Sequence, residues 1–188
     1  RRKQMMSGIH FNFSFGEELI QALFRAQSEF TDYKQFKVEM YLKVARNYAH
    51  YRWFVTYFYG ASPLSEPNFF EDDALQEPVR SIRNSKYGYV NADDVQVSYS
   101  SLQHYISDLA SLVQSGILSE EKEFYGSVRL RGGQRVADLE DHGIQYIELR
   151  NIDLNPYERN GMSEEQVQFL HLFLLYLLWK DEGDHRDE

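Results

Sequence analysis

Short polar side chains line one face of a strand-like segment near the start of the chain, residues 9–15. Apolar residues alternate there with His10, Asn12 and Ser14, so these three project to the same side of an extended strand. A strand face in contact with solvent more often carries Lys, Glu or Thr. The row therefore favours a lined cleft, although a set of hydrogen-bonded structural residues would produce the same pattern.

A second polar row lies in residues 143–150, which also read as a strand. Glu148 and Arg150 are two positions apart and so project to the same side. Glutamate is a hard oxygen ligand for Mg²⁺, and arginine presents a planar fork to carboxylate or phosphate. A cleft with both could hold a nucleotide–metal complex. A simple surface ion pair would explain the same two residues.

Two further groups of cations are weaker candidates. Residues 81–89 combine Arg83 and Lys86 with small residues around Gly88, which suits either an anion cradle or a loop with two exposed cations. The arginines beside Gly132-Gly133 are interpreted as solvated loop charges, because no P-loop or dinucleotide spacing occurs there. They are Arg129, Arg131 and Arg135.

The polar rows are expected to be held by an α+β fold, with helices packed behind the strands. Helical periodicity occurs in residues 19–24, in a long segment after Phe30 that ends at Gly60, and in residues 102–113. Ser163 and Gln166 predict a capping box for a helix that is apolar nearly all round. Residues 60–80 predict a surface loop, and residues 131–143 a mobile loop.

Composition excludes several classes of function. A formal charge of −9 argues against a nucleic-acid groove, which needs a basic surface. The chain has no cysteine, so disulfides and thiolate metal sites are excluded and a cytoplasmic location is the default. The longest apolar run, residues 169–179, is too short to cross a membrane. Because the chain lacks Met at position 1 and stops soon after an apolar helix, we expect it to be part of a longer protein.

Several exact strings resemble bacterial glutamate-cysteine ligase and occur in the order found in that family. The resemblance covers nearly the whole chain, and Asn151 and the helix string FLHLFLLY look most like the ligase half of the fused bifunctional glutathione synthetases. The other strings are MSGIHFNFS (6–14), RNY (46–48), YGASP (59–63), SIR (81–83), GY (88–89) and IELRNIDLNP (147–156).

The resemblance implies both a fold and a reaction. The fold would be a mixed, largely antiparallel, funnel-shaped sheet with packed helices, related to that of glutamine synthetase. ATP would phosphorylate the γ-carboxylate of L-glutamate, and the amine of L-cysteine would attack the acyl phosphate, with Mg²⁺ or Mn²⁺ as the cofactor. This is the first step of glutathione biosynthesis, and the longer chain could carry a fused glutathione synthetase (ATP-grasp) domain.

Roles for individual residues are implied by their positions in the matching strings. His10 and Glu148 would be metal ligands, and Arg150 would stabilise the transferring phosphoryl group of ATP. The residues expected to bind substrate are Arg83 for the glutamate carboxylate, Tyr89 and Tyr125 for the cysteine pocket, and Asn12 on the first polar row.

Part of the family's pattern is absent from this chain. The acidic segment upstream of the His10 strand, which supplies further metal ligands, and the remaining C-terminal part are missing. We therefore expect residues 1–188 to be the central part of a single catalytic domain and to be inactive in isolation. Two alternatives stay open: an amino-acid ligase of the same broad fold that accepts a different amine, and a non-catalytic amino-acid-binding module.

Overall fold

A three-stranded antiparallel sheet lies at the centre of the computed structural model, which describes residues 6–66, 69–70, 77–88, 91–92 and 94–183. The strand order is β1-β3-β2, so the last strand in the sequence pairs along both of its edges. The strands are β1 (Gly8–Phe13), β2 (Val128–Arg131) and β3 (Tyr146–Asp153).

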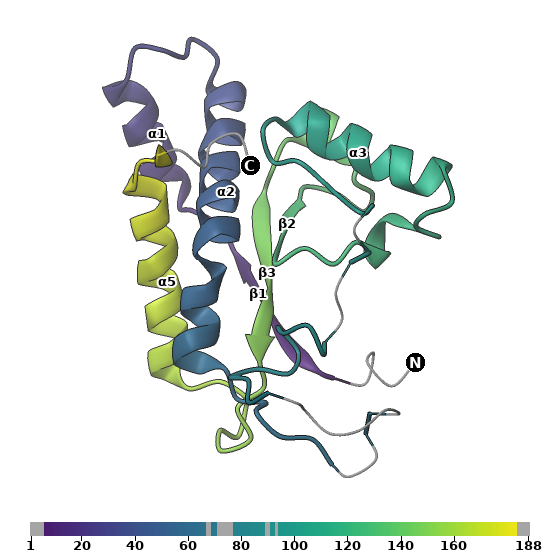
Figure 1. Cartoon of the computed structure of the whole chain (residues 1–188). Helices are drawn as coiled ribbons and strands as arrows, with labels where there is room; N and C mark the ends of the chain where they lie inside the picture. The colour runs from purple at the N-terminus through teal and green to yellow at the C-terminus, as the bar shows by residue number, and fades with distance from the viewer. Residues whose placement is uncertain (1–5, 67–68, 71–76, 89–90, 93, 184–188) are drawn as a thin grey trace.

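Two long helices cover one face of the sheet (Figure 1). α2 packs on β3, and α5 and α1 pack on α2, whereas α3 lies beyond β2 (Figure 1). None of the helices in the described part of the chain is long and apolar enough to cross a membrane. The helices are α1 (Glu17–Ala26), α2 (Tyr33–Tyr59), α3 (Leu102–Gln114), the 3-10 helix η2 (Glu121–Glu123), α4 (Asp138–His142) and α5 (Glu164–Trp179).

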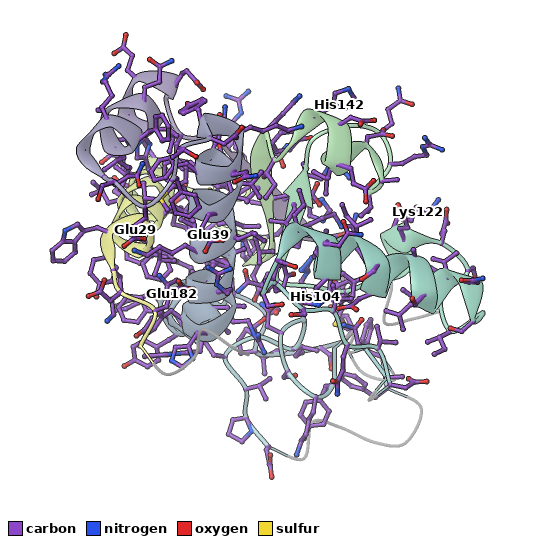
Figure 2. All side chains as sticks on the ribbon, turned by 90° about the horizontal axis from the view of Figure 1, so that it is seen from above. Glu29, Glu39, His104, Lys122, His142 and Glu182 are labelled. Carbon is purple, nitrogen blue, oxygen red and sulfur yellow. The ribbon has the colours of Figure 1, made fainter. Side chains whose placement is uncertain are left out.

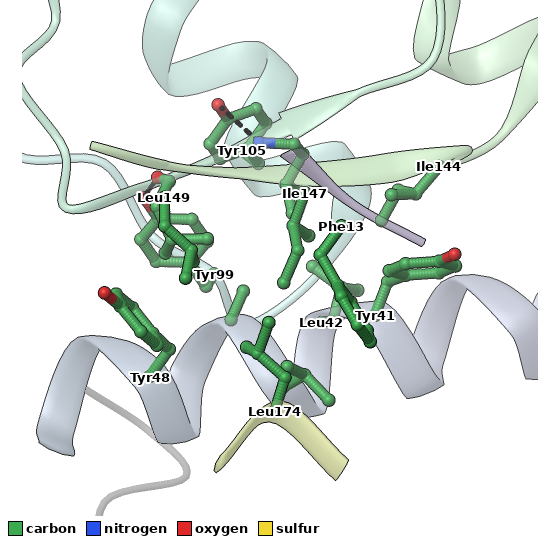
Figure 3. Packing of buried hydrophobic residues seen from close by; sticks show 14 of the residues in the cluster. Phe13, Tyr41, Leu42, Tyr48, Tyr99, Tyr105, Ile144, Ile147, Leu149 and Leu174 are labelled. Carbon is green, nitrogen blue, oxygen red and sulfur yellow. Dashed lines mark hydrogen bonds between the residues drawn. The ribbon is translucent and has the colours of Figure 1, made fainter. Parts of the chain in front are cut away.

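Alternating apolar residues of the three strands form one wall of the core. Phe13, Ile147 and Leu130 are register partners across the sheet, and all three are buried. Phe13 and Ile147 point towards α2, where they meet Leu42 and Tyr41 (Figure 3). Burial of apolar surface, at roughly 25 cal/mol per Å², holds the sheet against the helices. The opposite face of the same strands is left for polar side chains.

Helix boundaries follow local signals in the sequence. The side chain of Asp32 accepts a hydrogen bond from the backbone of Gln35 at the start of α2, and Gly60 follows its last residue. Ser163 and Gln166 make both hydrogen bonds of a capping box at the start of α5. The predicted end of the long helix and the predicted capping box are confirmed, as is the α+β class with helices packed on an antiparallel sheet.

The predicted mobile loop at residues 131–143 was wrong in part. β2 ends at Arg131, and α4 occupies residues 138–142. A strand of four residues with two apolar positions is too short for its alternation to stand out. The second predicted strand begins at Tyr146 rather than Gly143, because Gly143 adopts a φ of 68° and ends α4 in a conformation that favours glycine.

Buried charges tie α2 to the last described residues. Arg46 on α2 forms ion pairs with Glu39 and Glu182, and its Nη1 donates to the carbonyl oxygen of Tyr99 at 2.9 Å. Glu39 and Glu182 lie near each other where α2 passes the C-terminal segment (Figure 2). The guanidinium of Arg46 is therefore neutralised and hydrogen-bonded inside the protein, as a buried charge must be.

Replacing Tyr48 with phenylalanine should lower the free energy of unfolding by about 1–3 kcal/mol. The hydroxyl of Tyr48 is fully buried on α2 and donates to Oδ1 of Asn151 on β3, so its removal leaves a buried acceptor without this donor. Urea unfolding checks this result. Tyr57→Phe, at a position 66% exposed, is the matched control and should change stability by less than about 0.5 kcal/mol. Equal losses in the two variants would contradict the assignment.

Candidate functional site

The face of the sheet opposite the core carries the polar rows of β1 and β3. Asn12 is the register partner of Glu148, which pairs on its other side with Arg129. The register shifts at His10, and such a bulge redirects the side chain that it carries. Nδ1 of His10 lies 3.5 Å from Oε1 of Glu148. The two rows predicted from the sequence therefore meet across the strand pair.

Glu148 is the centre of this cluster, and it is buried. Nε of Arg150 lies 3.4 Å from Oε1, and Nε of Arg131 lies 3.7 Å from Oε2. Nε of Arg150 also lies 3.5 Å from Nε2 of His10. These distances are longer than those of tight charge-assisted hydrogen bonds. The carboxylate is thus surrounded by cationic groups that it could exchange for a bound cation.

Burial and neighbouring charges shift pKa values within the cluster. Burial lowers the pKa of His10 below its ordinary value of 6.5; the Glu148 carboxylate opposes this shift, and nearby arginines add to it. Burial, followed by the charge of Arg129, also lowers the pKa of Arg150. His10 is therefore neutral at neutral pH, which is the form of imidazole that binds metal ions.

Arg83 and Tyr125 lie beside Arg150. Nη1 of Arg83 donates to the carbonyl oxygen of Arg150 at 2.8 Å, and Nη1 of Arg150 donates to that of Phe124 at 3.0 Å. The ring of Tyr125 has its centre 5.8 Å from Cζ of Arg83 and 5.3 Å from Cζ of Arg150, within the range of cation–π contact. Nε of Arg83 is buried against Gly8 and has no hydrogen-bond partner among the described groups.

A cavity of about 1050 Å³ opens next to this group. Arg83, Tyr125 and Arg150 line it, whereas His10 and Glu148 do not, so Arg150 connects the polar row with the cavity. The described residues of its lining include cations and no carboxylate, which favours an anionic ligand. The cations are Arg46, Arg52, Arg80, Arg83, Lys86 and Arg150, of which Arg46 is already paired with Glu39 and Glu182, and Lys86 with Glu77.

His10 and Glu148 present two ligand atoms that fit one edge of a magnesium site. In an octahedral site with ligands at 2.0–2.1 Å, neighbouring ligand atoms lie roughly 3 Å apart. The observed distance of 3.5 Å between Nδ1 and Oε1 is close to that value. Within the described residues, no three His, Cys, Asp or Glu side chains gather as a metal site. The remaining ligands would be water, substrate oxygens or groups beyond these residues.

Most of the predicted site residues form one continuous group in the structure. Asn12 lies on the same polar row with an exposed side chain, and Tyr89 lies outside the described residues. The roles assigned to all of these residues stay predictions. The residues brought together are His10, Glu148, Arg150, Arg83 and Tyr125.

Sequence reasoning missed two residues of this face, Arg129 and Arg131. The interpretation of them as solvated loop charges was wrong, because both lie on β2, where Arg131 approaches Glu148 and Arg129 is its register partner. Arg135 alone of that group is well exposed, beside Asp138. The alternating string VRLR at residues 128–131 was the available signal.

Comparison with known proteins gives one family over the whole chain. The profile of the family described as glutamate-cysteine ligase matches residues 1–116 and 112–188. The glutathione biosynthesis bifunctional protein of Enterococcus faecalis is 60% identical, over 100% of this chain and 25% of its own length. The protein of the same description from Streptococcus thermophilus is 46% identical, over 98% of this chain and 24% of its own. The chain thus spans about a quarter of the length of these curated relatives.

Solved structures agree with the sequence matches. A bifunctional glutathione synthetase from Pasteurella multocida superimposes with a TM-score of 0.86 and 42% identity, covering 96% of this chain and 24% of its own. A glutamate-cysteine ligase from Francisella tularensis, in complex with AMP, gives a TM-score of 0.77 and 27% identity, covering 95% of this chain and 42% of its own. The resemblance predicted from short strings is confirmed.

Proposed function

This chain belongs to the glutamate-cysteine ligase family, and on that premise we propose that it forms the central part of a catalytic domain that joins the γ-carboxylate of L-glutamate to the amine of L-cysteine. The observation that carries the proposal is the convergence of His10, Glu148 and Arg150 on one sheet face beside a cation-lined cavity. Such a face suits a reaction in which phosphate and carboxylate oxygens must approach one another.

Arg150 is proposed to act on the phosphoryl group as it passes from ATP to the γ-carboxylate oxygen of glutamate. Its guanidinium is largely buried and is held at Nη1 by the carbonyl oxygen of Phe124, so it is already oriented before a ligand binds. The cysteine nitrogen then forms a bond to the acyl carbon and loses a proton as phosphate leaves, ADP having been released from the phosphoryl transfer. Preorganised positive charge of this kind supplies most of the catalysis in phosphoryl transfer.

His10 and Glu148 are proposed to hold Mg²⁺ or Mn²⁺, which when bound would offset the negative charge between the phosphate and carboxylate oxygens. Arg83, which lines the cavity, is proposed to bind a carboxylate of glutamate through its guanidinium group. Tyr125, together with Tyr89, is proposed to border the cysteine, and Asn12 to contact substrate from the exposed end of the polar row.

The relatives that this chain matches are described as bifunctional, and the chain covers about a quarter of them. We therefore extend the proposal to a longer protein with a fused glutathione synthetase (ATP-grasp) domain. A ligase that consumes ATP, glutamate and cysteine would act in the cytoplasm.

The test is ADP release by the full-length protein with ATP, Mg²⁺ and glutamate, with cysteine or another amine as the acceptor. Release that depends on cysteine, with a γ-glutamylcysteine product identified by mass, is the expected result. A higher rate with another amine would mean that this amine, and not cysteine, is the acceptor, and the rest of the proposal would stand. No release with any amine would favour an amino-acid-binding module instead.

The isolated 188-residue chain should show no cysteine-dependent ADP release under the same conditions. Its described residues gather only His10 and Glu148 as ligands at the proposed metal site, and an Mg²⁺ ion bound by two side chains is held weakly. Circular dichroism of the same sample establishes that the chain is folded. Turnover above the no-enzyme rate by a folded sample would refute the expectation.

A further inference from the structure

The last residue of β3 carries a buried carboxylate that lies outside the lining of the proposed site. Asp153 is only 3% exposed and is absent from the lining of the cavity. Its Oδ2 accepts hydrogen bonds from the backbone N–H of Ala61 at 2.9 Å and from Oγ of Ser62 at 2.8 Å. Its Oδ1 accepts from Oγ of Ser81 at 2.9 Å and from Nδ2 of Asn84 at 3.2 Å.

All four donors are neutral groups, and they come from two segments that are distant in sequence. Residues 61–62 follow α2, and residues 81–84 carry Arg83 in their middle. A backbone hydrogen bond of 2.7 Å from Ile82 to Ser62 joins the two segments directly. Nδ2 of Asn84 also donates to the carbonyl oxygen of Asn151 at 2.9 Å. The carboxylate therefore binds both segments at once to the end of the central strand, beside the direct bond from Asn84 to Asn151.

The position of Arg83 depends on this attachment. Its guanidinium lies over Gly8, where a Cβ atom would come within 2.4 Å of it, and Nη1 donates to the carbonyl oxygen of Arg150. Gly8 is in turn the register partner of Asp153. A small shift of residues 81–84 against β3 would therefore move the guanidinium away from the cavity or into the backbone of β1.

We infer that Asp153 is a positioning residue for the substrate carboxylate, because it fixes the segment that holds Arg83 in the cavity wall. The inference rests on the proposed function and on the assignment of Arg83 to glutamate. A carboxylate suits this task, since it has the acceptor capacity for four donors at once and gives each bond a direction. An amide cannot replace it, because one of its two ends is a donor and would face the donors from Ala61 or Asn84.

The experiment compares Asp153→Asn with wild type in the full-length protein. We expect the KM for glutamate to rise by roughly tenfold, within the range found when residues that orient a ligand-binding group are changed. The KM for ATP should stay within about twofold of the wild-type value, because the lost binding contacts are those to glutamate. 4-Aminobutyrate keeps the γ-carboxylate that reacts and lacks the α-carboxylate. The preference for glutamate over this compound should fall by a similar factor.

Two further variants separate positioning from general loss of stability. Asp138→Asn makes the same change at a carboxylate that accepts from the backbone N–H groups of Gln134 and Arg135; none of these residues lines the cavity, so the glutamate KM and the preference should stay unaltered. Ser62→Ala removes one of the four donors from a residue that does not line the cavity, and should raise the glutamate KM to a smaller extent. If Asp153→Asn does not fold, the glutamate KM of Ser62→Ala tests the positioning role.

Different results overturn the positioning role and the proposed function. Wild type that releases ADP with cysteine, together with an unaltered glutamate KM in Asp153→Asn and Ser62→Ala, overturns the positioning role and leaves the ligase proposal in place. The role is equally overturned if Asp138→Asn raises the glutamate KM as much as Asp153→Asn does. Wild type without cysteine-dependent release overturns the proposed function, and with it this inference.

Discussion

Arg150→Ala in the full-length protein should lower the rate of cysteine-dependent ADP release by about 10²–10³-fold, the loss found when one preorganised donor to a developing charge is removed. Arg150 is the residue that belongs both to the Glu148 cluster and to the lining of the cavity. Its guanidinium is held in place by Phe124 and Tyr125, so little reorganisation would be needed during the proposed phosphoryl transfer.

Two variants show whether this loss reflects the position of the charge. Arg150→Lys keeps a cation and loses the planar fork, so it should recover only part of the rate. Arg135→Ala removes an exposed arginine that pairs with Asp138 away from the Glu148 cluster, and should leave the rate within about twofold of wild type. A rate for Arg150→Ala equal to that of Arg135→Ala would show that Arg150 does not act on the phosphoryl group.

Glu148→Gln should lower kcat by about 10²-fold and raise the Mg²⁺ concentration needed for half-maximal ADP release by about 10- to 100-fold. The substitution keeps the size of the side chain and removes its charge. Two consequences follow: the metal loses its proposed carboxylate ligand, and Arg150 and Arg131 lose the carboxylate that lies between them. The measurement is a Mg²⁺ titration of the rate at saturating ATP, glutamate and cysteine.

The control for this titration is Glu140→Gln, which neutralises an exposed carboxylate on α4. Its Mg²⁺ dependence should match wild type. A drop in kcat for Glu148→Gln with no change in Mg²⁺ dependence would mean that Glu148 orients the arginines and does not bind metal. Unchanged kcat and unchanged Mg²⁺ dependence would show that Glu148 has no role in the reaction.

Local patterns predicted the elements that have strong local causes. The end of α2 at Gly60 and the capping box of Ser163 and Gln166 depend on residues within one helical turn, so they can be read from the chain alone. β2 was missed because four residues form a strand only by pairing with β3, and that pairing is not local. The arginines of β2 were consequently assigned to a loop.

By itself, the sequence determined the family, the polar rows of two strands, and the shared side of Glu148 and Arg150, which follows from the period of two along any extended strand. Only the tertiary structure decided that His10 meets Glu148, because that contact requires β1 and β3 to pair in one register with a bulge at His10. Only the tertiary structure, likewise, buried Asp153 among four donors. Such contacts join residues that are far apart in the sequence. They depend on strand register and on packing, and no local periodicity encodes either of these.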